Sequence, residues 1–167
     1  KRYLTLAKGA WPEGTTEVDP PLVTRRVGGG ARVKVDEAGK EARSTFRLID
    51  RFGKTASLLE VAIDTGRTHQ IRVHAAHTGH PVAGDERYGD KDFDEYLKSF
   101  GLTRMFLHAH SLSFEWPDTG EPFNASAPLP EDLKSVLTGL DEGRDARGRA
   151  TKGAVAEVKS AKGAARR

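Results

Sequence analysis

The chain has 167 residues, enough for one domain that buries about two-thirds of the surface exposed by its unfolded form. It contains no cysteine, which excludes disulfides and thiolate metal sites. No apolar run approaches the roughly 18 residues of a membrane span, and residues 1–10 lack the apolar core of a signal peptide. These features predict a cytoplasmic protein that has no membrane contact.

The net charge of +3 is unevenly distributed along the chain. Residues 141–167 hold eight basic and four acidic side chains, whereas residues 1–140 hold 19 basic and 20 acidic ones. The C-terminal segment has only Val155 and Val158 as larger apolar groups, too few to offset the entropy lost on ordering. We therefore predict a folded unit at 1–140 and a disordered basic tail at 141–167. Such a tail either attracts phosphates or simply solvates the protein, and the sequence leaves both roles open.

The first half of the chain predicts strands. The pattern indicates a short strand at 3–7, an irregular excursion at 12–30, and strands at 31–35, 44–49 and 55–63, with a turn at 50–53. Leu59, Val61 and Ile63 alternate and should share one face. The glycine run at 28–30 lacks the Lys-Ser/Thr pair of a phosphate-binding loop and predicts a turn.

The apolar period changes after residue 65 and predicts helices. We expect a helix at 68–78 with Thr68 as its N-cap and Gly79 as its stop signal. Further along, the pattern predicts a helix at 92–100, a strand at 104–115, its hairpin partner at 122–127 and a closing helix at 130–140. Adjacent strands with few helices indicate an α+β fold with a mixed, largely antiparallel sheet and flanking helices.

Four segments of the chain resemble a known family. The run Gly66-Arg67-Thr68-His69-Gln70-Ile71-Arg72-Val73-His74 resembles the signature of the RluA-like pseudouridine synthases at nine consecutive positions. Residues 1–4 are similar to the family's Lys-x-Tyr element, and residues 39–46 are similar to its following strand entry. Residues 106–109 and 119–121 are together similar to its last hairpin. The segment 84–90, with Phe93, Asp94 and Leu97, is most similar to the RluC-type branch, which modifies large-subunit ribosomal RNA.

The resemblance implies the pseudouridine synthase fold, a mixed sheet with a central RNA-binding cleft. It also implies an isomerase that converts uridine to pseudouridine in RNA, with 23S ribosomal RNA as the expected partner. The chemistry needs no metal and no organic cofactor, and no obligate protein partner is implied.

The family's catalytic aspartate lies in a His-Arg-Leu-Asp-type motif upstream of the Lys-x-Tyr element, and this chain begins at that element. Asp19, Asp36, Asp50 and Asp64 lack the Arg-Leu-Asp context. We therefore expect the chain to be the C-terminal part of a catalytic domain, inactive alone. The alternative is a non-catalytic RNA-binding remnant of such an enzyme.

The resemblance implies roles for six residues. Tyr3 would stack on the displaced base and is a candidate for proton handling. Arg72 would form the ion pair that orients the upstream aspartate, which a planar guanidinium can hold with two hydrogen bonds. Arg67, His69, Gln70 and His74 would contact RNA, Arg67 beside the free N–H groups that begin the helix.

The histidines raise a metal hypothesis. His74, His77 and His80 are spaced three apart, but Gly79 interrupts the helix before His80 and no glutamate lies between them as in helical zinc motifs. His108 and His110 face one side of a strand and are typical of hydrogen-bonded wall residues. We predict no metal site; a histidine-metal hydrolase remains the rival that a metal titration would test.

Overall fold

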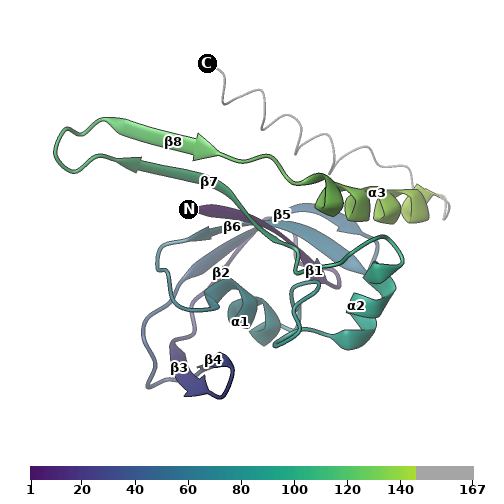
Figure 1. Cartoon of the computed structure of the whole chain (residues 1–167), viewed down its shortest axis with the longest axis horizontal. Coiled ribbons are helices and arrows are strands. Elements are labelled where there is room, and N and C mark those ends of the chain that lie inside the picture. Colours follow the sequence, from purple (N-terminus) through teal and green to yellow (C-terminus); the bar gives the residue numbers. More distant parts are fainter. Residues whose placement is uncertain (146–167) are drawn as a thin grey trace.

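The computed structural model describes residues 1–145, and the remainder of the expected basic tail lies outside the described residues. Six strands form one sheet in the order β2-β5-β6-β1-β7-β8 (Figure 1). Their bounds are Arg2–Lys8 (β1), Thr15–Val18 (β2), Ser44–Phe52 (β5), Ala56–Ile63 (β6), Leu107–Glu115 (β7) and Pro122–Ser126 (β8). Every pairing between these strands is antiparallel, so the fold class is α+β with an antiparallel sheet across the described part of the chain.

The two faces of the sheet are covered by different helices. Alternation along β1 sends Leu4 and Leu6 to one face, where they pack with apolar residues of α2 (Lys91–Lys98) and α3 (Glu131–Asp145). The opposite face carries α1 (Gln70–His77), whose Ile71 and Ala75 pack with Leu59 of β6. Figure 1 shows the sheet between α3 on one side and α1 on the other. Val61 lies in the same cluster as Leu59 and Ile63 packs against it, which confirms the shared face predicted for this strand.

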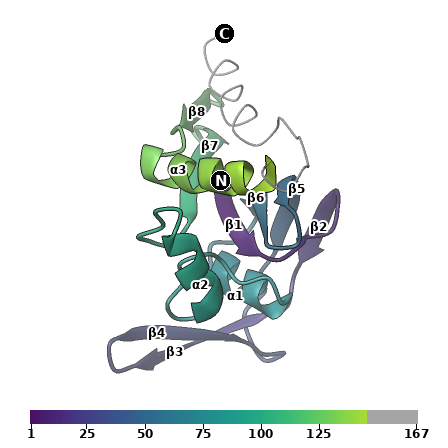
Figure 2. The ribbon, with the colours of Figure 1, turned by 90° about the vertical axis from the view of Figure 1, so that its right-hand side faces the viewer.

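A second sheet has two strands, β3 (Leu22–Val27) and β4 (Gly30–Val35), and we call residues 22–35 the ribbon. The ribbon packs beneath α1 through Leu22 and Val33, which share a small cluster with Val73 of that helix. Figure 2 shows it running past α1 and α2. The prediction of an irregular excursion at 12–30 was wrong, because β2 and β3 lie within it; the turn predicted at the glycines joins β3 to β4.

Several boundaries differ from the predicted ones. β5 continues through Phe52, so the turn before β6 begins at Gly53 and not at Asp50. The closing helix α3 continues to Asp145, five residues beyond the expected end of the folded unit at 140. Within residues 1–145, no helix is long and apolar enough to cross a membrane.

Candidate active site

The N-terminus of α1 has an unusual backbone. Thr68 is exposed and does not cap the helix, contrary to the prediction; the N-cap is His69, with φ 51° in the left-handed region and no capping side-chain bond. His69 is the only non-glycine residue with positive φ in the described chain. Such a conformation costs free energy in a non-glycine residue and persists only where the surroundings hold it. Part of that support comes from Gln70, whose Oε1 accepts hydrogen bonds from the Arg67 N–H at 3.1 Å and the Thr65 hydroxyl at 2.7 Å.

Arg72 of α1 forms an ion pair with Asp85, in the loop between α1 and α2. The guanidinium donates from Nε to Oδ2 and from Nη2 to Oδ1, each at 2.8 Å, so that the two planar groups meet edge to edge. The Arg72 side chain is 17% exposed and that of Asp85 is completely buried. Arg72 also lies over the ring of Tyr88, 5.0 Å from its centroid. These contacts fix the plane of the guanidinium and leave Nη1 outside the paired edge.

Asp85 accepts more hydrogen bonds than the ion pair alone supplies. Its Oδ1 also accepts from the backbone N–H groups of Arg87 at 3.0 Å and Tyr88 at 3.1 Å. Burial acts to raise the pKa of Asp85, but the bonds from Arg72 and the two amides outweigh it, so that the pKa lies below its usual value. The Asp85 carboxylate has no exposed surface and is bonded at both oxygens, so a substrate cannot reach it. Asp85 therefore acts as the partner that holds Arg72 and not as a nucleophile.

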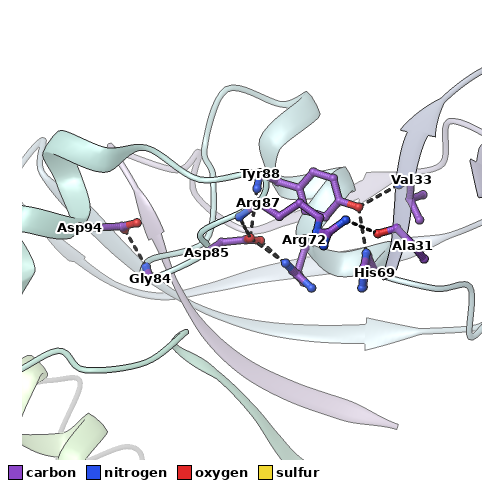
Figure 3. A network of polar contacts seen from close by, with 9 residues as sticks. All are labelled: Ala31, Val33, His69, Arg72, Gly84, Asp85, Arg87, Tyr88 and Asp94. Carbon is purple, nitrogen blue, oxygen red and sulfur yellow. Dashed lines mark hydrogen bonds and ion pairs between the residues drawn. The ribbon is translucent and has the colours of Figure 1, made fainter. Parts of the chain in front are cut away.

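Tyr88 connects this pair to the ribbon (Figure 3). Its hydroxyl accepts from the Val33 N–H at 2.8 Å and lies 2.8 Å from His69 Nδ1. Burial and the nearby Arg72 and Arg87 lower the pKa of His69, which favours the neutral ring at this contact. Arg87 adds a second connection by donating from Nη1 to the Ala31 carbonyl at 2.6 Å. Sequence reasoning missed both Asp85 and Tyr88, although they lie in the segment 84–90 that resembles the RluC-type branch.

Gln70 and His74 lie in the interior, 3% and 0% exposed. Gln70 Nε2 donates to the Arg43 carbonyl and to the Ser44 hydroxyl, which in turn lies 2.8 Å from His74 Nδ1. His74 Nε2 donates to the Pro20 carbonyl at 2.9 Å, which makes Nδ1 of the neutral ring the acceptor of the Ser44 proton. Burial, the largest cause, lowers the pKa of His74 and favours this neutral form. Both side chains thus join α1 to β5 and to the segment before β3, and their expected contact with RNA stays a prediction.

Arg67 is exposed, and its Nε donates to the Glu41 carbonyl at 2.8 Å. With Gly66 and Thr68 it lines an open pocket of about 440 Å³, whose other wall includes Val23 of the ribbon and Lys40. Of the four residues expected to contact RNA, Arg67 is the one whose side chain is exposed, and His69 is partly buried.

Tyr3 lies on the face of the sheet that carries α1, where its partly buried ring packs against the cluster that contains Ile71 and Ala75. It pairs with Val61 on β6 and, beside a register shift, with Ala109 on β7. It also lines an open pocket of about 310 Å³ between the start of β1 and the β7–β8 hairpin. The structure thus places Tyr3 and Arg72 on one face of the sheet, without bringing them into contact.

The histidines of the metal hypothesis have separate partners. His74 binds Ser44 and Pro20, His80 Nδ1 binds the Lys8 carbonyl, and both His108 and His110 bind the Ala127 carbonyl. No group of three or more potential metal-binding side chains gathers anywhere in residues 1–145 for which side chains are described. The rival metal hydrolase has no geometric support in this part of the chain.

Comparisons with known proteins agree with this fold. Residues 1–77 match the RNA pseudouridylate synthase family. The chain is 45% identical over 143 residues to the ribosomal large subunit pseudouridine synthase C of Pasteurella multocida, covering 85% of this chain and 44% of that protein. It is 42% identical over 147 residues to the same-named protein of Escherichia coli, covering 86% of this chain and 46% of the relative. The chain thus spans less than half the length of these relatives.

Solved structures of RNA pseudouridylate synthase domains also match this chain. The human RNA pseudouridylate synthase domain containing 1 superimposes with a TM-score of 0.64 and 25% identity, over 91% of this chain and 67% of that one. The domain containing 4 gives a TM-score of 0.65 at 23% identity, over 84% of this chain and 61% of that one, and supports the fold alone. The chain belongs to the RNA pseudouridylate synthase family. Within that family it is an RluA-like member of the RluC type.

Proposed function

We propose that this chain is the C-terminal part of the catalytic domain of a cytoplasmic pseudouridine synthase that acts on 23S ribosomal RNA. The observation that carries the proposal is the run Gly66–His74, which holds Arg72 in a fixed orientation through Asp85. The relatives named ribosomal large subunit pseudouridine synthase C support the substrate class.

The proposed reaction breaks the N–C glycosidic bond of uridine, turns the uracil and rejoins it to the sugar through carbon. The product is an isomer of the substrate, so the reaction needs no redox cofactor and no second substrate. It needs a carboxylate next to the sugar or the ring, which we assign to an aspartate upstream of Lys1. Arg72 is the cation that would orient this aspartate, since Asp85 occupies Nε and Nη2 and leaves Nη1 for a second carboxylate.

Asp85 supports this role by removing the rotational freedom of the Arg72 side chain. A bidentate pair with a buried carboxylate holds the guanidinium in one plane before the substrate arrives. Tyr88 covers one face of the same group. We assign Asp85 and Tyr88 as positioning residues and Arg72 as the residue that touches the reacting groups.

Tyr3 and Arg67 are the proposed contacts to the RNA. Tyr3 would stack on the extruded uracil and is the candidate for proton handling, supported by its place on the α1 face of the sheet. Arg67 would bind a phosphate or sugar from the pocket that it lines with Lys40. His69 would act by holding the start of α1 through Tyr88, with at most a minor contact of its own.

The proposal is tested with the purified whole protein and a transcript of 23S ribosomal RNA, by mapping pseudouridine after incubation. We expect conversion of uridine at a small number of defined positions. Binding of the transcript without conversion at any position would favour the alternative, a non-catalytic RNA-binding remnant. If the protein neither binds nor converts the transcript, both the proposed enzyme and the RNA-binding remnant are contradicted.

A further inference from the structure

The ribbon has two chemically different faces. The register pairs Leu22 with Val35, Thr24 with Val33 and Arg26 with Ala31. On this inner face Leu22, Val33 and Val35 pack with Val73 of α1. The outer face carries the alternate positions. It presents Arg25 directly opposite Arg32, and Lys34 opposite Val23.

The outer face is unusually basic. Three of the four cations of residues 22–35, Arg25, Arg32 and Lys34, lie on this face, and the segment has no acidic residue. The rest of the segment 1–140 has the opposite balance, with 15 basic and 20 acidic residues. The ribbon is thus a localised positive surface on an otherwise acidic folded unit.

The arrangement of these cations works against the stability of the ribbon. Like charges directly opposite on paired strands are destabilising, as Arg25 and Arg32 are here. Both side chains are exposed, and neither forms an ion pair with a residue of the described chain, whereas Lys34 lies 3.4 Å from Asp36. Asp36 attracts Arg25 without forming an ion pair with it, and an anion bound from outside would further offset the repulsion between Arg25 and Arg32.

We propose that the outer face of the ribbon binds the phosphate backbone of RNA next to the candidate active site. This inference rests on the proposed function and adds a docking surface to it. The outer face has no aromatic ring on which a base could stack, so it contacts phosphates and does not read sequence.

Hydrogen bonds join the ribbon to the candidate active site, so an RNA bound to the ribbon is held in a fixed position relative to that site. The Tyr88 hydroxyl accepts from Val33, and Arg87 donates to Ala31, while the same loop supplies Asp85 to Arg72 (Figure 3). At the other end of the ribbon, Val23 borders the pocket that also contains Lys40 and Arg67. The cations of the outer face therefore lie next to the pocket of Arg67, which is already proposed to contact RNA.

The test replaces two of the cations in the whole protein by Arg25→Gln with Arg32→Gln. The control is Lys54→Gln with Lys91→Gln, which removes the same charge from exposed positions outside the ribbon. Binding of a fluorescent 20-base-pair RNA duplex is followed by anisotropy at several salt concentrations. We expect the ribbon variant to bind about tenfold more weakly at low salt, with a salt slope smaller by about two, while the control keeps the wild-type slope.

Folding is monitored by thermal unfolding. Because the substitution removes a repulsive pair, the ribbon variant should melt at or above the wild-type temperature, so weaker binding would not result from unfolding. An unchanged salt slope in the ribbon variant, or an equal loss in both variants, overturns the docking surface. Wild-type affinity for polyglutamate as high as for the duplex would indicate an acidic protein partner and overturns the RNA assignment. Failure of the wild type to bind any RNA contradicts the proposed function itself.

Discussion

At the residue scale, the guanidinium of Arg72 can bind Asp85 and still offer Nη1 to a second carboxylate. A guanidinium has five N–H donors in a rigid plane, and Asp85 uses those of Nε and Nη2. The buried carboxylate fixes the plane, while Nη1 is directed away from the pair. Arg72 can therefore be held by this chain and still meet an aspartate supplied from upstream.

Replacing Arg72 tests whether its guanidinium orients the catalytic aspartate. In the whole protein, Arg72→Ala should lower single-turnover conversion of uridine by about 100- to 1,000-fold, since loss of one preorganised contact costs on the order of 2.7–4 kcal/mol. Arg72→Lys should restore only part of the rate, because an ammonium keeps the charge and loses the planar fork. RNA affinity is measured on the same samples. Near-normal turnover with lost affinity would make Arg72 a phosphate contact.

Replacing Asp85 tests the positioning role. Asp85→Asn leaves Arg72 without its counter-charge, and we expect a loss of about 2–3 kcal/mol in unfolding free energy, below the range for fully buried pairs because Arg72 is partly exposed. Turnover should fall while RNA affinity holds. The acid limb of the stability curve provides a second readout. The lowered pKa of Asp85 means that its contribution is complete above its ordinary pKa and lost as pH falls through the folded value, and the variant should lack this loss.

At the scale of elements, α1 is held by a buried polar chain that runs from Gln70 through Ser44 and His74 to Pro20. Ser44 and His74 each accept one hydrogen bond and donate the next, and the Pro20 carbonyl accepts the last one. This pattern requires a neutral imidazole at His74. Protonation of His74 would add a proton at Nδ1, where the ring must accept from Ser44. The attachment of α1 to β5 is therefore sensitive to pH.

The free energy of unfolding should therefore depend on the protonation of His74. The pKa of His74 lies below its ordinary value of 6.5, so its contribution is complete above pH 6.5 and is lost as pH falls through the lower folded value. Urea unfolding at a series of pH values should show decreasing stability on acidification. His74→Gln should flatten this dependence without abolishing it, since His69 titrates in the same direction. An unchanged slope in His74→Gln would show that His74 does not couple protonation to folding.

The attachment of the ribbon can be tested at Gly39, which lies against the backbone of Leu22. A Cβ at this position would lie 2.5 Å from the Leu22 carbonyl carbon, so Gly39→Ala must displace the start of β3. We expect a loss of about 1–3 kcal/mol in unfolding free energy, typical of overpacking, and weaker RNA binding. Gly28→Ala is the matched control, because its Cβ would meet nothing within 4 Å. Equal effects of the two substitutions would rule out the close packing at Gly39 as the cause.

Sequence patterns predicted the elements that have apolar periodicity. The strands β1, β4 and β6 and the helix α2 follow them closely, because alternating or helical apolar positions face a core. β2 and β3 were missed because β2 is only four residues long and β3 buries Leu22 alone, while prolines and glycines dominate the surrounding composition. Arg72 was identified from the signature run. Its partner Asp85 could not be derived from periodicity, because it lies in a loop where tertiary contacts alone determine which acid is buried.

At the scale of the whole molecule, the chain corresponds to less than half the length of its relatives. Its relatives are more than twice as long as the matched segment, which covers 44% and 46% of two of them. In the described part, Arg72 has Asp85 as its acidic partner, and that carboxylate is buried and bonded at both oxygens. We therefore propose that the chain provides the orienting cation, a stacking ring and a basic ribbon, and that the catalytic carboxylate comes from an upstream segment.

We propose that this chain belongs to an enzyme that makes pseudouridine in 23S ribosomal RNA. The most direct test maps pseudouridine across that RNA in cells that lack the gene, and again after the gene is returned in its wild-type or Arg72→Ala form. We expect defined positions to lose pseudouridine on deletion, to recover it with the wild-type gene and not to recover it with Arg72→Ala. An identical set of modified positions with and without the gene would contradict it.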